Sequence, residues 1–178
     1  MNSGRTTRRL TLASLLSALS AVMLIVGAYT DMLSLTVAAA SSLIMVLVYI
    51  ELGSPYTWLV WLATSLLTAI FSLASPVWVQ YLLIFGIYPV IKGYLERTPR
   101  PLWLPIKFLL FNAYFFALFL IEEFIFGIPF FEVDAIWLKA VTYALSLVAF
   151  FVYDYFIAYM ASIYLSHFHQ KVQRYLNR

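Results

Sequence analysis

The chain contains no cysteine, and this absence excludes disulfide bonds, thiolate metal sites and a cysteine nucleophile. Charged residues are scarce as well, at 11% of the 178 residues, compared with about 25% in ordinary soluble domains. The only histidines, His167 and His169, lie close to the carboxyl terminus, so the apolar part of the chain has no histidine-based site. This composition is not that of a protein whose main solvent is water.

Long uncharged segments take the place of charged surface. Hydrophobic residues make up 64% of the chain, and runs of about eighteen or more apolar residues recur, which is the length that a helix needs to cross a bilayer. The pattern predicts an all-α, six-helix bundle that forms a single integral membrane domain in the lipid bilayer. The predicted spans are residues 10–28, 33–50, 56–73, 77–91, 104–126 and 135–162, and a basic tail follows over 167–178.

The first apolar run follows Arg5, Arg8 and Arg9, as the core of a secretory signal peptide would. Two features favour a retained membrane helix instead. The run is as long as a bilayer-crossing helix needs to be, and residues 29–32 lead directly into a second apolar run rather than into a soluble domain. We therefore expect this segment to remain part of the protein.

Two of the later spans are irregular. Gly86 and Pro89 interrupt the fourth, and such residues are tolerated where neighbouring helices satisfy the freed backbone groups, so this span is expected to face protein rather than lipid. The fifth has Lys107 near its start and Glu122 and Glu123 near its end. Long charged side chains that reach the headgroup region would still let this helix cross.

The basic residues predict the orientation. All eleven Lys and Arg residues except Lys139 fall on one side of the membrane if the amino terminus is inside, and basic residues accumulate on the cytoplasmic side. We expect a multi-pass protein of the cell membrane with both termini in the cytoplasm. No nucleic-acid partner is expected, because the net charge of +3 is not accompanied by aromatic stacking platforms on a water-facing surface.

No motif points to catalysis. The chain lacks the HExxH motif, the nucleophile elbow, the glycine-rich phosphate loop and any Ser-Lys or Ser-His pairing. Intramembrane prenyl-protein endopeptidases use a glutamate pair, which Glu122 and Glu123 resemble, but the arginine and the later histidines of that class are missing here. We expect no enzyme activity, no catalytic residue, no cofactor and no metal, and keep an intramembrane protease as a remote alternative.

Acidic residues in the predicted spans are candidates for function, because a charge in the bilayer is costly. Glu122 and Glu123 point about 100° apart on a helix, so both cannot face one narrow site. They either cap the outer end of the fifth span or supply one ligand contact. Asp154 lies near the inner end of the sixth span, where Lys92 and Lys107 are the available cations. We expect a structural ion pair there rather than a proton relay.

Small residues recur every four positions in the first span, a spacing that lets helix backbones approach closely. Ala13, Ser17 and Ala21 form one stripe, and Ser14 and Ala18 form a second stripe one position along. The spacing predicts close contact with another helix, either of this chain or of a partner.

The layout of six helices with both ends inside and small residues spaced by four in the first helix resembles the substrate-binding S components of energy-coupling factor (ECF) transporters. Three stretches are similar to a group of S-component-like membrane proteins: Ile50-Glu51-Leu52-Gly53, residues 85–92 (Phe-Gly-Ile-Tyr-Pro-Val-Ile-Lys) and Tyr153-Asp154-Tyr155. Ser17 stands where the family usually has alanine.

The resemblance implies the capture of a vitamin or another micronutrient from the external side. The stripe Ala13, Ser17 and Ala21 would dock on a transmembrane coupling subunit that is served by cytoplasmic ATPases. An excess of acids near the expected pocket favours a cationic or zwitterionic ligand. Judged by depth and side, the substrate-binding residues would be Tyr29, Asp31, Trp78, Gln80, Tyr81, Asn112, Glu122, Glu123 and Lys139.

A membrane scaffold or assembly protein that transports nothing is the alternative from another class. Such a protein would fill the outer ends of its fourth to sixth helices with apolar side chains. A binding protein would have a roofed cavity there, with polar groups that converge on it.

Overall fold

The computed structural model describes residues 3–30, 34–127, 136–170 and 172–173. Over these ranges the chain is helical and contains no strand, which confirms the all-α prediction. Six segments are long and apolar enough to cross a membrane, as a multi-pass protein requires: Thr6–Tyr29, Ser34–Leu52, Ser54–Phe71, Val77–Leu95, Arg100–Phe124 and Ile136–His167. The inside-outside orientation and the identity of the membrane stay predictions.

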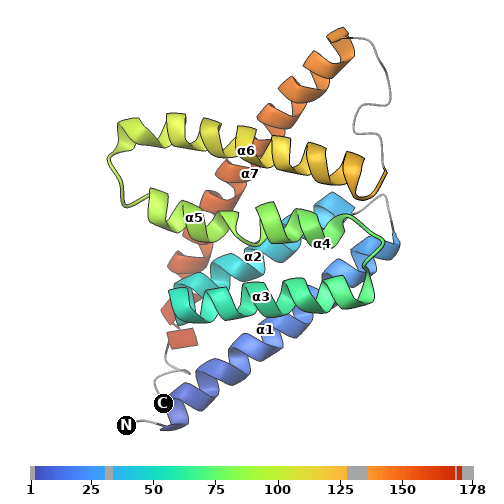
Figure 1. Cartoon of the computed structure of the whole chain (residues 1–178). Helices are drawn as coiled ribbons and strands as arrows, with labels where there is room; N and C mark the ends of the chain where they lie inside the picture. Colours follow the sequence, from blue (N-terminus) through green and yellow to red (C-terminus); the bar gives the residue numbers. More distant parts are fainter. Residues whose placement is uncertain (1–2, 31–33, 128–135, 171, 174–178) are drawn as a thin grey trace. The chain divides into compact units, whose positions relative to one another are not determined.

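The helical elements follow the predicted spans, with differences at the ends and in the fourth span (Figure 1). The first helix begins before residue 10 and the last continues past residue 162, because a helix that leaves the bilayer can continue in water. The elements are α1 (Ser3–Tyr29), α2 (Ser34–Leu52), α3 (Ser54–Phe71), α4 (Val77–Gln80), the π-helical segment η2 (Tyr81–Phe85), α5 (Tyr88–Leu95), the 3-10 turn η3 (Arg100–Leu102), α6 (Trp103–Phe124) and α7 (Ile136–His167).

The chain divides into two compact units, which are described separately. Unit 1 consists of Met1–Gly93 and Ile157–Arg178, and unit 2 consists of Tyr94–Phe156. Helix α7 therefore contributes residues to both units.

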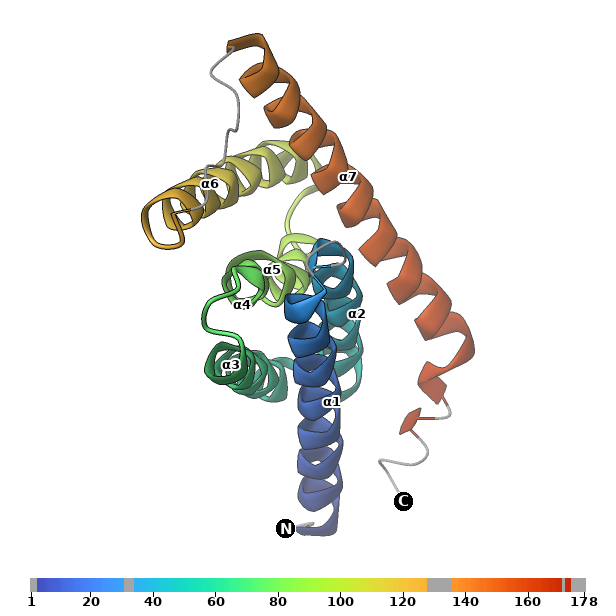
Figure 2. The same ribbon diagram turned by 90° about the vertical axis from the view of Figure 1, so that its right-hand side faces the viewer.

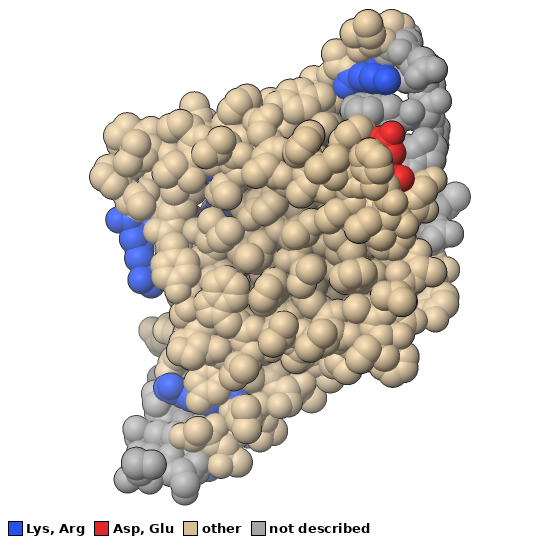
Figure 3. Space-filling model, in the orientation of Figure 1, with Lys and Arg blue, Asp and Glu red and all other residues tan. Residues whose placement is uncertain are grey.

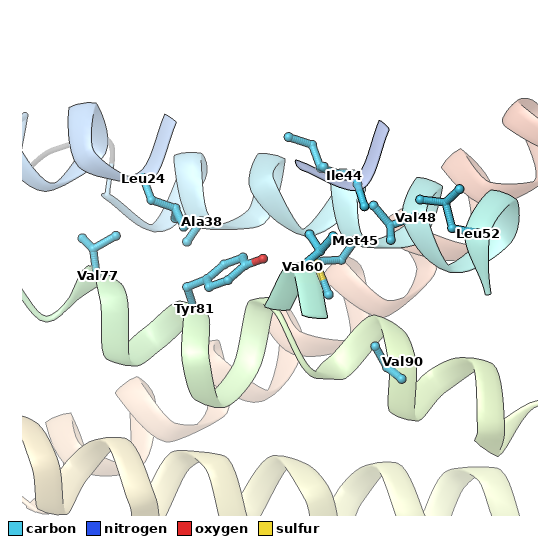
Figure 4. Close-up of a cluster of buried hydrophobic side chains, with 11 residues drawn as sticks. Leu24, Ala38, Ile44, Met45, Val48, Leu52, Val60, Val77, Tyr81 and Val90 are labelled. Atoms are coloured by element: carbon cyan, nitrogen blue, oxygen red, sulfur yellow. The ribbon is translucent and has the colours of Figure 1, made fainter. Parts of the chain in front are cut away.

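In unit 1, helices α1 and α2 lie side by side, and α3 and α4 pack against the same side of this pair (Figure 2). The apolar core lies between these elements and includes Leu24 of α1, Met45 of α2, Val60 of α3 and Tyr81 of η2 (Figure 4). The ring of Tyr81 enters this cluster from the fourth span. Four segments of the sequence thus share one core.

Small residues bring the backbones of unit 1 close together. A Cβ atom on Gly27 would lie 3.0 Å from Cβ of Val37, and one on Gly93 would lie 2.6 Å from the ring of Tyr49. Each value is shorter than an ordinary van der Waals contact. Glycine at these positions lets α1 and α5 pack directly on α2.

Unit 2 is packed by large rings. Phe111 of α6 lies 5.5 Å, between ring centroids, from both Tyr143 and Phe150 of α7, and Phe115 lies 5.2 Å from Tyr143 in an edge-to-face arrangement. Such aromatic pairs prefer these offset and edge-on geometries. The rings keep the two helices in contact without close approach of their backbones.

Charged side chains lie near helix ends on the face drawn in Figure 3, and uncharged side chains cover the middles of the helices. Many large apolar side chains of α6 and α7 are exposed, among them Leu109, Phe116, Leu145 and Val152. Lipid tails are a favourable environment for such side chains.

Candidate functional site

The fourth span is broken between α4 and α5. Pro89 has no N–H group, and in a regular helix its ring would clash with the carbonyl of Phe85, four residues earlier. The chain avoids the clash because the helix stops at Phe85 and starts again at Tyr88, which places Pro89 in the first turn of α5. Just before this stop the helix widens, and the N–H of Gly86 donates to the carbonyl oxygen of Tyr81, five residues back, at 2.7 Å. The sequence predicted an interruption by Gly86 and Pro89, and the structure shows its form as a π-helical turn.

The wide turn frees the carbonyl of Leu82, which a regular helix would pair with Gly86. The indole Nε1 of Trp61, on α3, donates to this carbonyl oxygen at 3.1 Å. A Cβ on Gly86 would lie 2.7 Å from Cδ1 of Trp61 and 2.9 Å from the Tyr81 carbonyl oxygen, so only glycine fits. Trp61 and Gly86 together stabilise a break that the bilayer alone would not tolerate.

Beside this break, hydroxyl groups from α1, α2 and α3 meet in the interior of unit 1. Ser20 and Ser41 are hydrogen-bonded to each other, and the hydroxyl oxygens of Ser17 and Thr64 lie 3.3 Å apart. All four side chains are buried. We call these four residues, together with Tyr81, the hydroxyl cluster.

Tyr81 is fully buried, and its hydroxyl lies beside those of Ser20, Ser41 and Thr64. Within the described part of the chain this hydroxyl has no well-formed hydrogen bond. A buried polar atom without a partner costs about 1–3 kcal/mol, and in a native structure it needs an explanation such as a water or a ligand. The hydroxyl of Tyr81 is therefore the strongest candidate contact for a bound group.

The residues predicted to line an external pocket fall in both units. Trp78, Gln80 and Tyr81 belong to unit 1, as does Tyr29, whose hydroxyl donates to the carbonyl oxygen of Phe71 at 3.2 Å. Asp31 lies outside the described residues. Unit 2 contains the others: Asn112, Glu122, Glu123 and Lys139.

Asn112 is engaged in packing within unit 2. The hydroxyl of Tyr143 donates to its side-chain oxygen at 2.9 Å, and its amide nitrogen donates to the Phe108 carbonyl at 2.8 Å. Glu122 is half-buried, Glu123 is exposed, and both belong to the last turn of α6, which ends at Phe124. The geometry of unit 2 thus uses Asn112 as a link between α6 and α7.

Asp154 is paired with Lys107, one of the two partners expected from the sequence. The Lys107 ammonium lies 2.5 Å from Asp154 Oδ2, and the two side chains are 12% and 11% exposed. The ammonium also lies 5.8 Å from the centre of the Trp103 ring. Lys92, the other expected partner, is buried and belongs to unit 1, so a pair with it stays a prediction.

The stripe predicted to dock on a partner lies inside the fold. Ala13, Ser17 and Ala21 are 4%, 6% and 3% exposed, and Ser17 contacts Thr64 of α3. These side chains make the close contact that their spacing predicted, but with helices of this chain, and are not accessible to a partner in this arrangement. The second stripe, Ser14 and Ala18, is exposed.

A buried carboxylate in unit 1 was missed by the sequence analysis. Glu51, in the last turn of α2, is 3% exposed in its side chain and contacts Tyr164, His169 and Gln173. We call these four residues the Glu51 cluster. The second span was predicted to end at residue 50, next to Glu51, and residues 167–178 were predicted to be a basic tail. Glu51 does belong to one of the stretches that carry the family resemblance.

In the part of the chain that the structure describes, no group of three or more His, Asp or Glu side chains is placed to hold a metal ion. Comparison of the chain with protein-family models, with curated protein sequences and with solved structures found no match. The residues and their geometry therefore carry the functional argument.

Proposed function

We propose that the chain is the membrane-embedded solute-binding subunit of an importer of the ECF S-component type. The observation that supports this most is the break in the fourth span beside the hydroxyl cluster. Broken membrane helices in transporters lie at solute and ion sites, because irregular backbone is tolerated only where protein or a cavity satisfies it. π-Helical turns are likewise frequent at functional sites.

Tyr81 is the residue through which the solute would be bound. Its buried hydroxyl makes no well-formed hydrogen bond within the described chain, although three hydroxyls lie beside it, so a solute group that donates or accepts a hydrogen bond there would improve its pairing. The surrounding side chains, Ser20, Ser41 and Thr64, are neutral. The position suits a neutral polar group of the solute, whereas Glu122 and Glu123, two of the acids that favoured a cationic ligand, belong to unit 2.

Access to this position requires movement. Ser20 and Ser41 touch, and Tyr81 is fully covered, so the solute enters only when the fourth span moves away from α1 and α2. The π-helical turn is the natural place for that bend, since its backbone is already held by a side chain, Trp61, rather than by the helix itself. Gating by bending at such a point is common in transporters.

A coupling subunit served by ATPases would need an accessible surface on α1. Ser14 and Ala18 provide one, because both are small, exposed and spaced by four. We expect the coupling subunit to dock through small residues of α1, as in the family, but through Ser14 and Ala18, each one position after a residue of the buried stripe.

The test is to identify what the purified chain binds. Small molecules released from the denatured protein are identified by mass spectrometry, and each is added back while the unfolding temperature is measured. We expect Tyr81→Phe to lose most of the retained compound and its stabilising effect. Tyr114→Phe is the matched control, since Tyr114 of α6 also has a buried hydroxyl without a partner in the described chain, and it should bind normally.

A chain that retains no small molecule, and that no vitamin stabilises, would refute the transport proposal. A surface of unit 2 would then favour the scaffold alternative. Leu147, Val148, Phe151, Val152 and Tyr155 of α7 line a shallow, open and apolar hollow that a helix of another membrane protein would fit. Co-purification of a membrane protein without any small molecule would support that role.

A further inference from the structure

Residues that follow α7 also pack against unit 1. Beyond His167 the backbone N–H of Phe168 donates to the carbonyl of Tyr164 at 2.9 Å, and that of Val172 donates to the carbonyl of Phe168 at 3.3 Å. The Tyr164 and Phe168 rings are stacked, 6.2 Å apart and inclined by 14°. The described residues of this part of the chain, 164–170 and 172–173, are what we call the strap.

The strap is attached to α2 through a single carboxylate. Tyr164 donates to Glu51 Oε1 at 2.7 Å, His169 Nδ1 lies 2.9 Å from the same oxygen, and Gln173 donates to Oε2 at 3.1 Å. Both oxygens of Glu51 are therefore engaged, and by three side chains that lie 113 to 122 residues away in the sequence. Hydrogen bonds to an ionised group are about twice as strong as neutral ones.

Apolar contact accompanies these bonds. Val172 packs against the core cluster of unit 1, which includes Leu52 next to Glu51. Val172 is a single, half-buried side chain and covers little apolar surface. The carboxylate is therefore the main attachment of the strap.

One side of this attachment is partly exposed. The side chain of His169 is 34% exposed, whereas that of Glu51 is 3% exposed. A buried carboxylate is stable only while its hydrogen-bond partners stay in place, and removal of a partner from such a group costs several kcal/mol. We therefore expect the three contacts of Glu51 to form and break together, and one of the partners, His169, is partly exposed.

We propose that the strap is a releasable clamp on unit 1, closed while the Glu51 side chain binds Tyr164, His169 and Gln173 and open when these contacts are lost. Release uncovers the surface under Val172 at the end of α2 and frees the end of α7 from unit 1. The proposal is independent of solute binding, because Glu51 lies in the last turn of α2, ten residues after Ser41 of the hydroxyl cluster.

The absence of cysteine makes the clamp directly testable. Val172→Cys introduces a single thiol on the side of the strap that packs against unit 1, and its rate of reaction with a maleimide is measured on the full chain in detergent and in vesicles. We expect Glu51→Ala and Glu51→Gln to raise this rate at least tenfold. Gln170→Cys, at an exposed position, should react quickly in every variant. Glu123→Ala, which removes an acid outside the Glu51 cluster, is the matched control for Glu51→Ala.

Two further variants separate release from unfolding. His169→Leu combined with Gln173→Leu removes two partners without altering α2, and it should raise the Val172→Cys rate in the same way. A thiol at Ala38, which is fully buried, should stay unreactive throughout. The proposal would be overturned if, with Glu51 intact, the thiol at position 172 reacted as fast as the thiol at position 170. It would also be overturned if the rate at position 172 did not change in the variants. Labelling of position 38 together with position 172 would indicate unfolding and would equally overturn it.

Discussion

The two units solve the same problem, holding helices together in lipid, in different ways. In unit 1, Gly27, Ser17 and Ser20 bring backbones into direct contact, and hydroxyl pairs link them. In unit 2, Phe111 and its ring neighbours fill the space between α6 and α7. Because lipid tails compete equally for apolar side chains, helix association depends on packing and hydrogen bonds. We therefore expect larger side chains to destabilise unit 1, and we expect the stability of unit 2 to depend on its few polar contacts.

The largest effect is expected in unit 1, from Ser17→Trp. The Ser17 hydroxyl lies 3.3 Å from that of Thr64 and its side chain is 6% exposed, so an indole has no space. Overpacking of a dense core costs about 1–3 kcal/mol and sometimes more. We expect loss of a monodisperse folded protein in size-exclusion chromatography. Ala18→Trp, one position along and exposed, should leave folding intact and reduce only the association with a coupling subunit.

An intermediate effect is expected in unit 2, from Asp154→Asn. The change leaves the Lys107 ammonium, 12% exposed, without its counter-charge. We expect a loss of about 2 kcal/mol, below the range for fully buried pairs because the site is partly accessible. Denaturant unfolding of the purified chain measures it. Lys107→Met in the same protein should recover part of the loss, and a double variant no more stable than Asp154→Asn would argue against this pair.

The smallest effect is expected from Tyr143→Phe. The change removes one hydrogen bond, to Asn112, and keeps the ring contacts with Phe111 and Phe115. Side-chain hydrogen bonds between membrane helices contribute about 0.6 kcal/mol on average. The same unfolding assay should show a loss of this size. A loss as large as that of Asp154→Asn would mean that the polar link, rather than the rings, positions α7 against α6.

The sequence predicted the six spans because each depends on local composition alone. It also predicted where the fourth would break, since Gly86 and Pro89 act on their own backbone. The partner of Ser17 could not be predicted, because a spacing of four gives the contact face but not its neighbour. The role of Glu51 was missed for the same reason: its partners lie more than one hundred residues away, in a tail that looks water-facing by composition.

The π-helical turn also sets the rotational phase of everything that follows it in the fourth span. It inserts one extra residue into the helix, and each residue of an α-helix accounts for about 100° of rotation. Gly93 follows in α5, where its missing side chain leaves room for the Tyr49 ring of α2, which a Cβ atom would meet at 2.6 Å. Trp61, by donating to the Leu82 carbonyl, thus holds a turn that lies about three helical turns before the place where α5 meets α2.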